Sequence, residues 1–149
     1  CVGALEKPRP RVALGLALNG IASAAIDVSD GLLADLGHIA ERSACAASVK
    51  LVQLPHLRDV AGSGDSYDAD LRRFALECQL AGGDDYELCF TAPGTQNLAI
   101  AQIAARLELP LWNIGEMTAG PAGDVTVLDP DGKPVEFARK GYDHFGNPA

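Results

Sequence analysis

Apolar and polar positions along the chain follow two different periods, which predict a mixture of helices and strands. Apolar residues that recur every three or four positions predict helices over residues 12–18, 32–40, 71–78 and 98–107. Short apolar runs predict strands over residues 24–28, 46–51, 86–91, 111–114, 124–128 and 135–138. Elements mixed in this order indicate an α+β fold, built as a two-layer domain with a mixed β-sheet and helices.

Turn-forming residues separate these elements. Asn19 and Gly20 are expected to end the first helix, and Thr95 is expected to cap the last one. The run Asp129-Pro-Asp-Gly-Lys-Pro134 predicts a hairpin between the last two strands.

The segment Asp27-Val-Ser-Asp-Gly31 lies where a predicted strand ends and a predicted helix begins. Ser29 or Asp30 is expected to cap that helix, and Gly31 allows a tight turn or a close approach to a ligand. Backbone N–H groups at a helix start favour anions, whereas the carboxylates of Asp27 and Asp30 favour divalent cations. A metal–phosphate complex satisfies both preferences. The alternative is an ordinary helix cap with one additional solvated aspartate.

A second polar segment, Gly82-Gly-Asp-Asp-Tyr-Glu-Leu88, follows the predicted helix over residues 71–78. Two glycines beside the carboxylates of Asp84 and Asp85 suit a loop that closes on a ligand. The alternative is a glycine that ends the helix, followed by a polar turn.

A third segment, Gly141-Tyr-Asp-His-Phe145, lies near the C-terminus. Its two aromatic residues either pack the end of the chain onto the core or contribute to a pocket for an aromatic ligand. The residues of this segment alone leave both interpretations open.

Composition restricts the class of protein. The chain has 149 residues, of which 48% are hydrophobic, so it is long enough for one core of its own. The net charge of −8 argues against a sequence-independent nucleic-acid surface, and no apolar run approaches the ~20 residues of a membrane span. The four cysteines lack metal-site spacing and are expected to be reduced, mostly buried thiols of a cytoplasmic protein. Residues 1–10, with Pro8 and Pro10, resemble a linker or the remnant of a preceding domain, and residues 11–149 are expected to form the domain.

Taken together, the three segments resemble the thiamine-monophosphate kinase family. They occur in the order Ile-Asp-Val-Ser-Asp-Gly-Leu, Gly-Gly-Asp-Asp-Tyr-Glu-Leu-Cys-Phe and Gly-Tyr-Asp-His-Phe. That family belongs to the aminoimidazole ribonucleotide synthetase-like superfamily. The resemblance is to its C-terminal half, so the family's N-terminal nucleotide-binding domain would be absent from this chain.

The resemblance implies ATP-dependent phosphorylation of thiamine monophosphate to thiamine diphosphate with Mg²⁺, in the cytoplasm, by a protein that is a homodimer at full length. It implies that Asp27 and Asp30 ligate Mg²⁺ and that Ser29 contacts the phosphates of ATP. It also implies that Asp84 contacts the thiamine substrate and that Tyr142 flanks it.

One position departs from the family pattern, because the family usually has Glu where this chain has Asp84. The shorter side chain loses about one methylene of reach, so its contact is expected to become water-mediated or to shift to Asp85. The loop glycines Gly82 and Gly83 are further candidates for substrate binding.

Phosphoryl transfer needs in-line positioning and charge neutralisation more than a covalent nucleophile. Clustered aspartates recruit the Mg²⁺ that supplies this neutralisation, so an acidic protein can bind polyphosphates. No arrangement of Ser, Cys or His suggests a phosphoenzyme, which favours direct transfer. Two alternatives remain open: a non-catalytic binding or assembly module, and a superfamily relative with another phosphorylated substrate. The isolated chain is expected to be inactive as a kinase.

Overall fold

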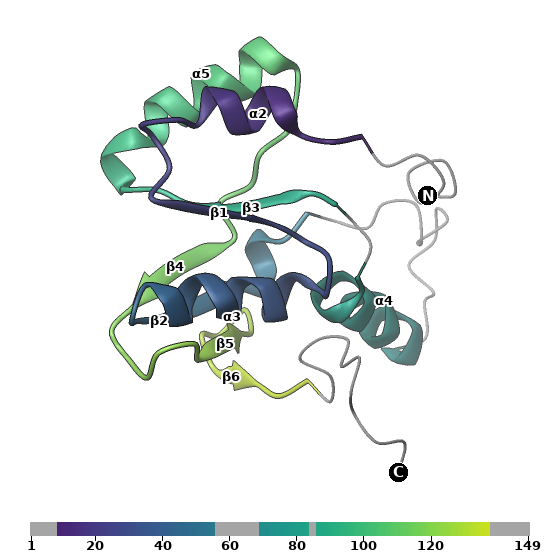
Figure 1. Cartoon of the computed structure of the whole chain (residues 1–149). Coiled ribbons are helices and arrows are strands. Elements are labelled where there is room, and N and C mark those ends of the chain that lie inside the picture. The colour runs from purple at the N-terminus through teal and green to yellow at the C-terminus, as the bar shows by residue number, and fades with distance from the viewer. Residues whose placement is uncertain (1–8, 56–68, 84–85, 138–149) are drawn as a thin grey trace.

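The computed structural model describes residues 9–55, 69–83 and 86–137. The elements in chain order are α2 (Val12–Ala17), β1 (Ala24–Asp27), α3 (Leu32–Arg42), β2 (Ala46–Lys50), η1 (Leu51–Gln53), α4 (Ala69–Ala81), β3 (Leu88–Thr91), η2 (Gly94–Gln96), α5 (Asn97–Leu107), β4 (Gly115–Thr118), β5 (Val125–Leu128) and β6 (Pro134–Val135) (Figure 1). None of the helices within these ranges is long and apolar enough to cross a membrane.

The strands form two separate sheets. Strands β4, β2, β5 and β6 form a four-stranded sheet in that order, in which β2 and β5 are parallel and the other neighbours are antiparallel. Strands β1 and β3 form an antiparallel two-stranded ribbon. The α+β class with a mixed sheet is therefore confirmed, and the ribbon is an addition to the predicted picture.

The β1–β3 ribbon lies between two hydrophobic clusters. On one side α2, its C-cap residue and α5 contribute Leu14, Leu18 and Ile103. On the other side α3 covers the four-stranded sheet (Figure 1). Successive residues of a strand point to opposite faces. Accordingly Leu88 and Phe90 of β3 pack against the α2–α5 cluster, whereas Cys89 packs against the α3 cluster.

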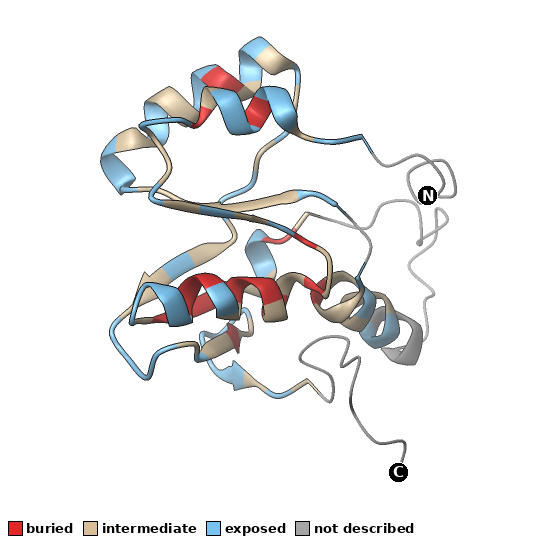
Figure 2. Ribbon diagram, in the orientation of Figure 1, coloured by how far each residue is buried: buried red, intermediate tan, exposed pale blue. Residues whose placement is uncertain are grey.

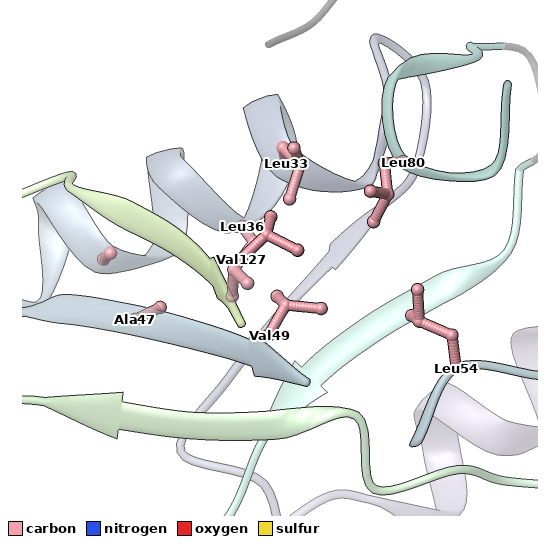
Figure 3. Packing of buried hydrophobic residues seen from close by; sticks show 8 residues of the cluster. Leu33, Leu36, Ala47, Val49, Leu54, Leu80 and Val127 are labelled. Carbon is pink, nitrogen blue, oxygen red and sulfur yellow. The ribbon is translucent and has the colours of Figure 1, made fainter. Parts of the chain in front are cut away.

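The larger cluster is built on the apolar side of α3, which is mostly buried (Figure 2). Its buried members come from α3, β2, β5, α4 and the segment after η1, and they are Leu33, Leu36, Ala40, Ala47, Val49, Leu54, Leu80 and Val127 (Figure 3). Ala40, Val49 and Leu80 are fully buried. This packing fixes the start of α3 against the end of α4, and the candidate site lies there.

The predicted hairpin near the C-terminus is confirmed. Strands β5 and β6 are antiparallel, with Val127 opposite Val135. The side-chain Oδ1 of Asp129 accepts hydrogen bonds from the backbone N–H groups of Asp131 and Lys133, at 2.9 and 2.8 Å. An aspartate that bonds to the backbone two residues later is a turn-forming device, which explains why the sequence pattern was informative.

Two local predictions are wrong. Thr95 does not cap a helix, because it lies inside η2, and α5 begins after Gln96 without a side-chain cap. Residues 111–114 do not form a strand; β4 begins at Gly115 instead. The apolar run connects the two clusters, since Leu111 packs against the α2–α5 cluster and Ile114 against the α3 cluster. At Gly115 the backbone of β4 approaches β2 so closely that a Cβ there would overlap the carbonyl oxygen of Ser48.

Two glycines allow the segment before α3 to approach the end of α4. Gly31 has a φ of 114°, and a Cβ there would lie 2.9 Å from the carbonyl carbon of Ala81. A Cβ at Gly83 would overlap the carbonyl oxygen of Ser29. Only a residue without a side chain fits such an approach of two backbones.

Cys45, Cys78 and Cys89 are free thiols. Cys45 and Cys89 are partly buried, whereas Cys78 is exposed, so the expectation of mostly buried thiols fails at Cys78. Burial raises the pKa of the Cys89 thiol from its usual 9.0 to about 11, and the negative charge of Asp35 acts in the same direction.

The close approach at Gly83 gives a first prediction. Gly83→Ala should lower the free energy of unfolding by about 1–3 kcal/mol, because the added Cβ must displace the backbone of Ser29. Gly94→Ala is the matched control, since nothing lies within 4 Å of a Cβ at that position. Urea unfolding of both variants measures the difference, and equal stability of the two would contradict the close approach.

The Cys89 thiol gives a second prediction. Its pKa is about 11 in the folded protein and near 9.0 in the unfolded chain, so the unfolded chain binds fewer protons between these pH values. The stabilising contribution is complete below pH 9 and decreases as the pH rises towards about 11, by at most about 1.4 kcal/mol per pH unit.

Denaturant unfolding between pH 8 and 11 measures this decrease. Cys89→Ala should flatten the loss of stability over that range, whereas Cys78→Ala should retain it because Cys89 is still present. An unchanged slope in Cys89→Ala would show that this thiol keeps its ordinary pKa in the folded protein.

Candidate functional site

The ladder of β1 and β3 brings the first two sequence segments side by side. Asp27 at the end of β1 is opposite Leu88 at the start of β3. The pairing continues beyond both strands, since the Val28 N–H donates to the Glu87 carbonyl at 2.8 Å and the Tyr86 N–H donates to the Val28 carbonyl at 2.9 Å. The loop of residues 27–31 therefore lies against the chain that enters β3.

The loop before α3 is not capped as predicted. The N-cap of α3 is Gly31, and no side chain caps the helix, so the expectation of Ser29 or Asp30 at this position is wrong. The backbone N–H groups of Ser29 and Asp30 instead donate to Oδ2 of Asp35, at 2.9 and 3.1 Å. Asp35 lies in the first turn of α3 and is buried, with 2% of its surface exposed.

This arrangement changes the chemistry expected of the loop. The N–H groups of Ser29 and Asp30, which were expected to lie at the helix start and to favour an anion, precede the helix and bind the Asp35 carboxylate instead. The polar side chains at this position are those of Asp27, which is exposed, and of Ser29 and Asp30, which are partly buried. Two carboxylates and a hydroxyl suit a cation and its phosphate partners better than a bare anion.

The side chains of Asp27 and Asp30 fit a Mg²⁺ ion that is also bound by substrate phosphates. In the described part of the chain, no group of three or more His, Cys, Asp or Glu side chains is arranged to hold a metal ion by itself. Mg²⁺ is usually held by one or two carboxylates together with substrate phosphates and water, rather than by an all-protein cage. Asp27 and Asp30 would hold the ion in this way, with phosphate oxygens as the remaining ligands.

The loop glycines lie where the sequence predicted a ligand loop. The Gly83 backbone contacts the backbone of Ser29, and a Cβ at Gly83 would lie 3.6 Å from the Cα of Asp30. A Cβ at Gly82 would overlap the carbonyl oxygen of Cys78, so this glycine closes the end of α4. The structure thus brings Ser29, Asp30 and the two glycines together.

Three of the predicted site residues lie outside the described residues. These are Asp84, Asp85 and Tyr142. Their roles therefore remain predictions of the sequence.

An ion pair that the sequence did not predict supports the same region. Nε of Arg11 donates to Oε2 of Glu87 at 2.7 Å, and Nη2 of Arg11 donates to Oε1 of Glu87. The hydrogen bond to Glu87 raises the pKa of Arg11, and the opposite charge of Glu87 adds to that effect. The pair joins the start of α2 to the residue before β3, so Glu87 connects two elements of the fold. The two residues are 76 positions apart, and no local pattern relates them.

Asp35 is the second residue that the sequence reasoning missed. It interrupts the apolar face of α3 between Leu32, Leu33 and Leu36, and a charge at a core position needs a hydrogen-bonding partner. That interruption is a signal in the sequence, although it does not say which backbone groups provide the partner.

Comparison with known proteins identifies the family of this chain. Residues 3–128 match the model of the family described as AIR synthase related protein, C-terminal domain. The chain is 44% identical over 146 residues to "Thiamine-monophosphate kinase" of Salmonella typhimurium and 41% identical over 142 residues to the protein of the same name from Escherichia coli K12. Each of these matches covers 95% of this chain and 41% of the relative, so the chain spans about two fifths of their length.

Solved structures of similar fold carry related names. A thiamine-monophosphate kinase from Stenotrophomonas maltophilia K279a has a TM-score of 0.71 and 48% identity, over 86% of this chain and 37% of that one. A structure described as AaThiL complexed with AMPPCP and TMP has a TM-score of 0.66 and 28% identity, over 97% of this chain and 40% of that one. From the match over most of its length, the chain belongs to the AIR synthase related protein family, as a C-terminal domain of that family.

Proposed function

We propose that this chain is the C-terminal part of a thiamine-monophosphate kinase, which phosphorylates thiamine monophosphate to thiamine diphosphate with ATP. The observation that carries the proposal is the contact between the loop of residues 27–31 and the Gly82-Gly83 segment, which the β1–β3 ladder holds together. The named relatives cover nearly the whole chain and support the assignment.

In this proposal the loop of residues 27–31 binds the metal and the phosphates of ATP. Asp27 and Asp30 hold Mg²⁺, and the Ser29 hydroxyl contacts the nucleotide phosphates. When bound, Mg²⁺ neutralises charge on the phosphates that meet during transfer. The residues of this chain orient the reacting groups. Direct transfer is favoured, because no arrangement of Ser, Cys or His in the sequence suggests a phosphoenzyme.

The substrate side of the proposed site is formed by the third and second segments. In this proposal Tyr142 flanks the thiamine, and Asp84 or Asp85 accepts hydrogen bonds from its amino group. Gly82 and Gly83 are further candidates for contact with the substrate. The complex of the similar AaThiL structure with AMPPCP, an ATP analogue, and TMP supports binding of both ligands by proteins with this fold.

The proposal includes a division of the protein into parts. Residues 1–10 form a linker, residues 11–149 form the substrate- and phosphate-binding domain, and a preceding nucleotide-binding domain completes the site. The full-length protein would be a cytoplasmic homodimer. The match covers 41% of each of these relatives, which supports a longer protein.

The metal site predicts the effect of removing one carboxylate charge. In the longer protein that the proposal requires, Asp27→Asn should lower kcat roughly a thousandfold or more, because a neutral amide does not hold Mg²⁺ beside the phosphates. The melting temperature should change little, since Asp27 is exposed. Steady-state kinetics at saturating Mg²⁺ and ATP measure kcat.

Asp131→Asn is the matched control, since Asp131 is an exposed aspartate in the β5–β6 hairpin. It should leave kcat at the value of the unmodified protein. Near-normal turnover of Asp27→Asn would remove Asp27 from the metal site.

The substrate pocket predicts a selective change in KM. Tyr142→Ala in the same protein should raise the KM for thiamine monophosphate about fivefold, because a ring stacked on the cationic thiazolium contributes roughly 1 kcal/mol. The KM for ATP should stay nearly constant. An equal increase for both substrates, or a large fall in melting temperature, would instead assign Tyr142 to packing of the C-terminal segment.

A further inference from the structure

We infer that Asp35 is a positioning residue for the metal-binding loop: its buried carboxylate fixes the backbone of Ser29 and Asp30 so that Asp27 and Asp30 keep the arrangement that Mg²⁺ requires. This inference rests on the proposed function of the loop. We assign Asp35 to positioning rather than to metal binding, because it is buried and its Oδ2 atom accepts hydrogen bonds from two amides of the loop.

The geometry shows how the carboxylate acts on the loop. One oxygen atom, Oδ2, accepts hydrogen bonds from two consecutive N–H groups, at 2.9 Å from Ser29 and 3.1 Å from Asp30. A hydrogen bond to an ionised acceptor is roughly twice as strong as one between neutral groups. Both bonds end on a side chain that α3 holds rigidly, since Leu33 and Leu36 on either side of it are buried in the core.

The burial of Asp35 makes its hydrogen bonds to the loop energetically important. Its side chain is 2% exposed, and a charge removed from water destabilises the fold unless hydrogen bonds compensate it. A leucine at this position would extend the apolar face of α3 and bury more apolar surface. It would also leave the N–H groups of Ser29 and Asp30 without the acceptor that they have now.

The consequence for metal binding follows from the spacing of the loop. Asp27 is anchored in the β1–β3 ladder, whereas Asp30 lies beyond the end of the strand. The Asp35 carboxylate holds the backbone at Ser29 and Asp30. This stretch lies between Asp27 and Gly31, the N-cap of α3. Residues that orient metal ligands typically contribute a factor of 10–100 to metal affinity, although they do not touch the ion.

The test compares Asp35→Asn with Glu41→Gln, which makes the same carboxylate-to-amide change on an exposed position of α3. The first measurement is hydrogen exchange of the amides of Ser29 and Asp30. Asp35→Asn should accelerate their exchange at least tenfold, whereas Glu41→Gln should leave it unchanged. Unaltered protection in Asp35→Asn would overturn the inference.

The second measurement uses Mn²⁺ alone as the probe and follows the paramagnetic broadening of amide signals from residues 27–31. Asp35→Asn should raise the Mn²⁺ concentration for half-maximal broadening about 10–100-fold. Faster exchange with an unchanged Mn²⁺ titration would assign Asp35 to folding alone and overturn the inference. If Asp35→Asn does not fold, Asp35→Glu, which keeps the charge but moves it by one methylene, should shift both measurements in the same direction.

Neither measurement depends on catalysis. Absence of kinase activity in the longer protein, with both effects of Asp35→Asn present, would therefore refute the proposed function while the role of Asp35 in metal binding stands.

Discussion

The antiparallel pairing of β1 with β3 is the contact on which the candidate site depends. It places Asp27 opposite Leu88 and continues through Val28, so two segments far apart in sequence become neighbours. A two-stranded ribbon is barely stable by itself in water. This ribbon persists because each face packs on a different hydrophobic cluster, one from α2 and α5 and one from α3. The four residue pairs of the β1–β3 ladder therefore link the packing of the two clusters to the geometry of the site.

The acidic residues of the two segments have different functions in the structure. Asp35 holds backbone amides and Glu87 holds Arg11, so both connect parts of the fold. Asp27 and Asp30 are the carboxylates to which we assign the proposed metal-binding role. The number of acids in a motif thus overstates the number of ligands, because a loop that binds a cation also needs acceptors for its own N–H groups.

The sequence predicted the order and type of the elements well, because each depends on a local period of apolar residues. It also placed the loop of residues 27–31 and the two glycines correctly, since a strand end, a helix start and paired glycines are local signals. It failed where contacts outside the apolar pattern decide the outcome. Arg11 pairs with Glu87, 76 positions away, and no local pattern relates the two. The Asp35 contact is local, but apolar periodicity does not show that a carboxylate in the helix binds the N–H groups of Ser29 and Asp30. Residues 111–114 were apolar enough for a strand, yet they connect the two clusters, and β4 begins at Gly115.

The parallel pairing of β2 with β5 has a consequence for how the chain reaches this structure. Ala47 pairs with Val125, so the ribbon strand β3, the helices α4 and α5, and β4 all lie between the two partners in sequence. Contacts of such long sequence separation form slowly, because the entropy of closing a long loop is lost before the contact gains anything. During synthesis on the ribosome, β2 has no β5 to pair with until the chain up to Leu128 has emerged. The sheet is therefore expected to be the last part of the domain to form, and the edge of β2 the surface most exposed to wrong partners until then.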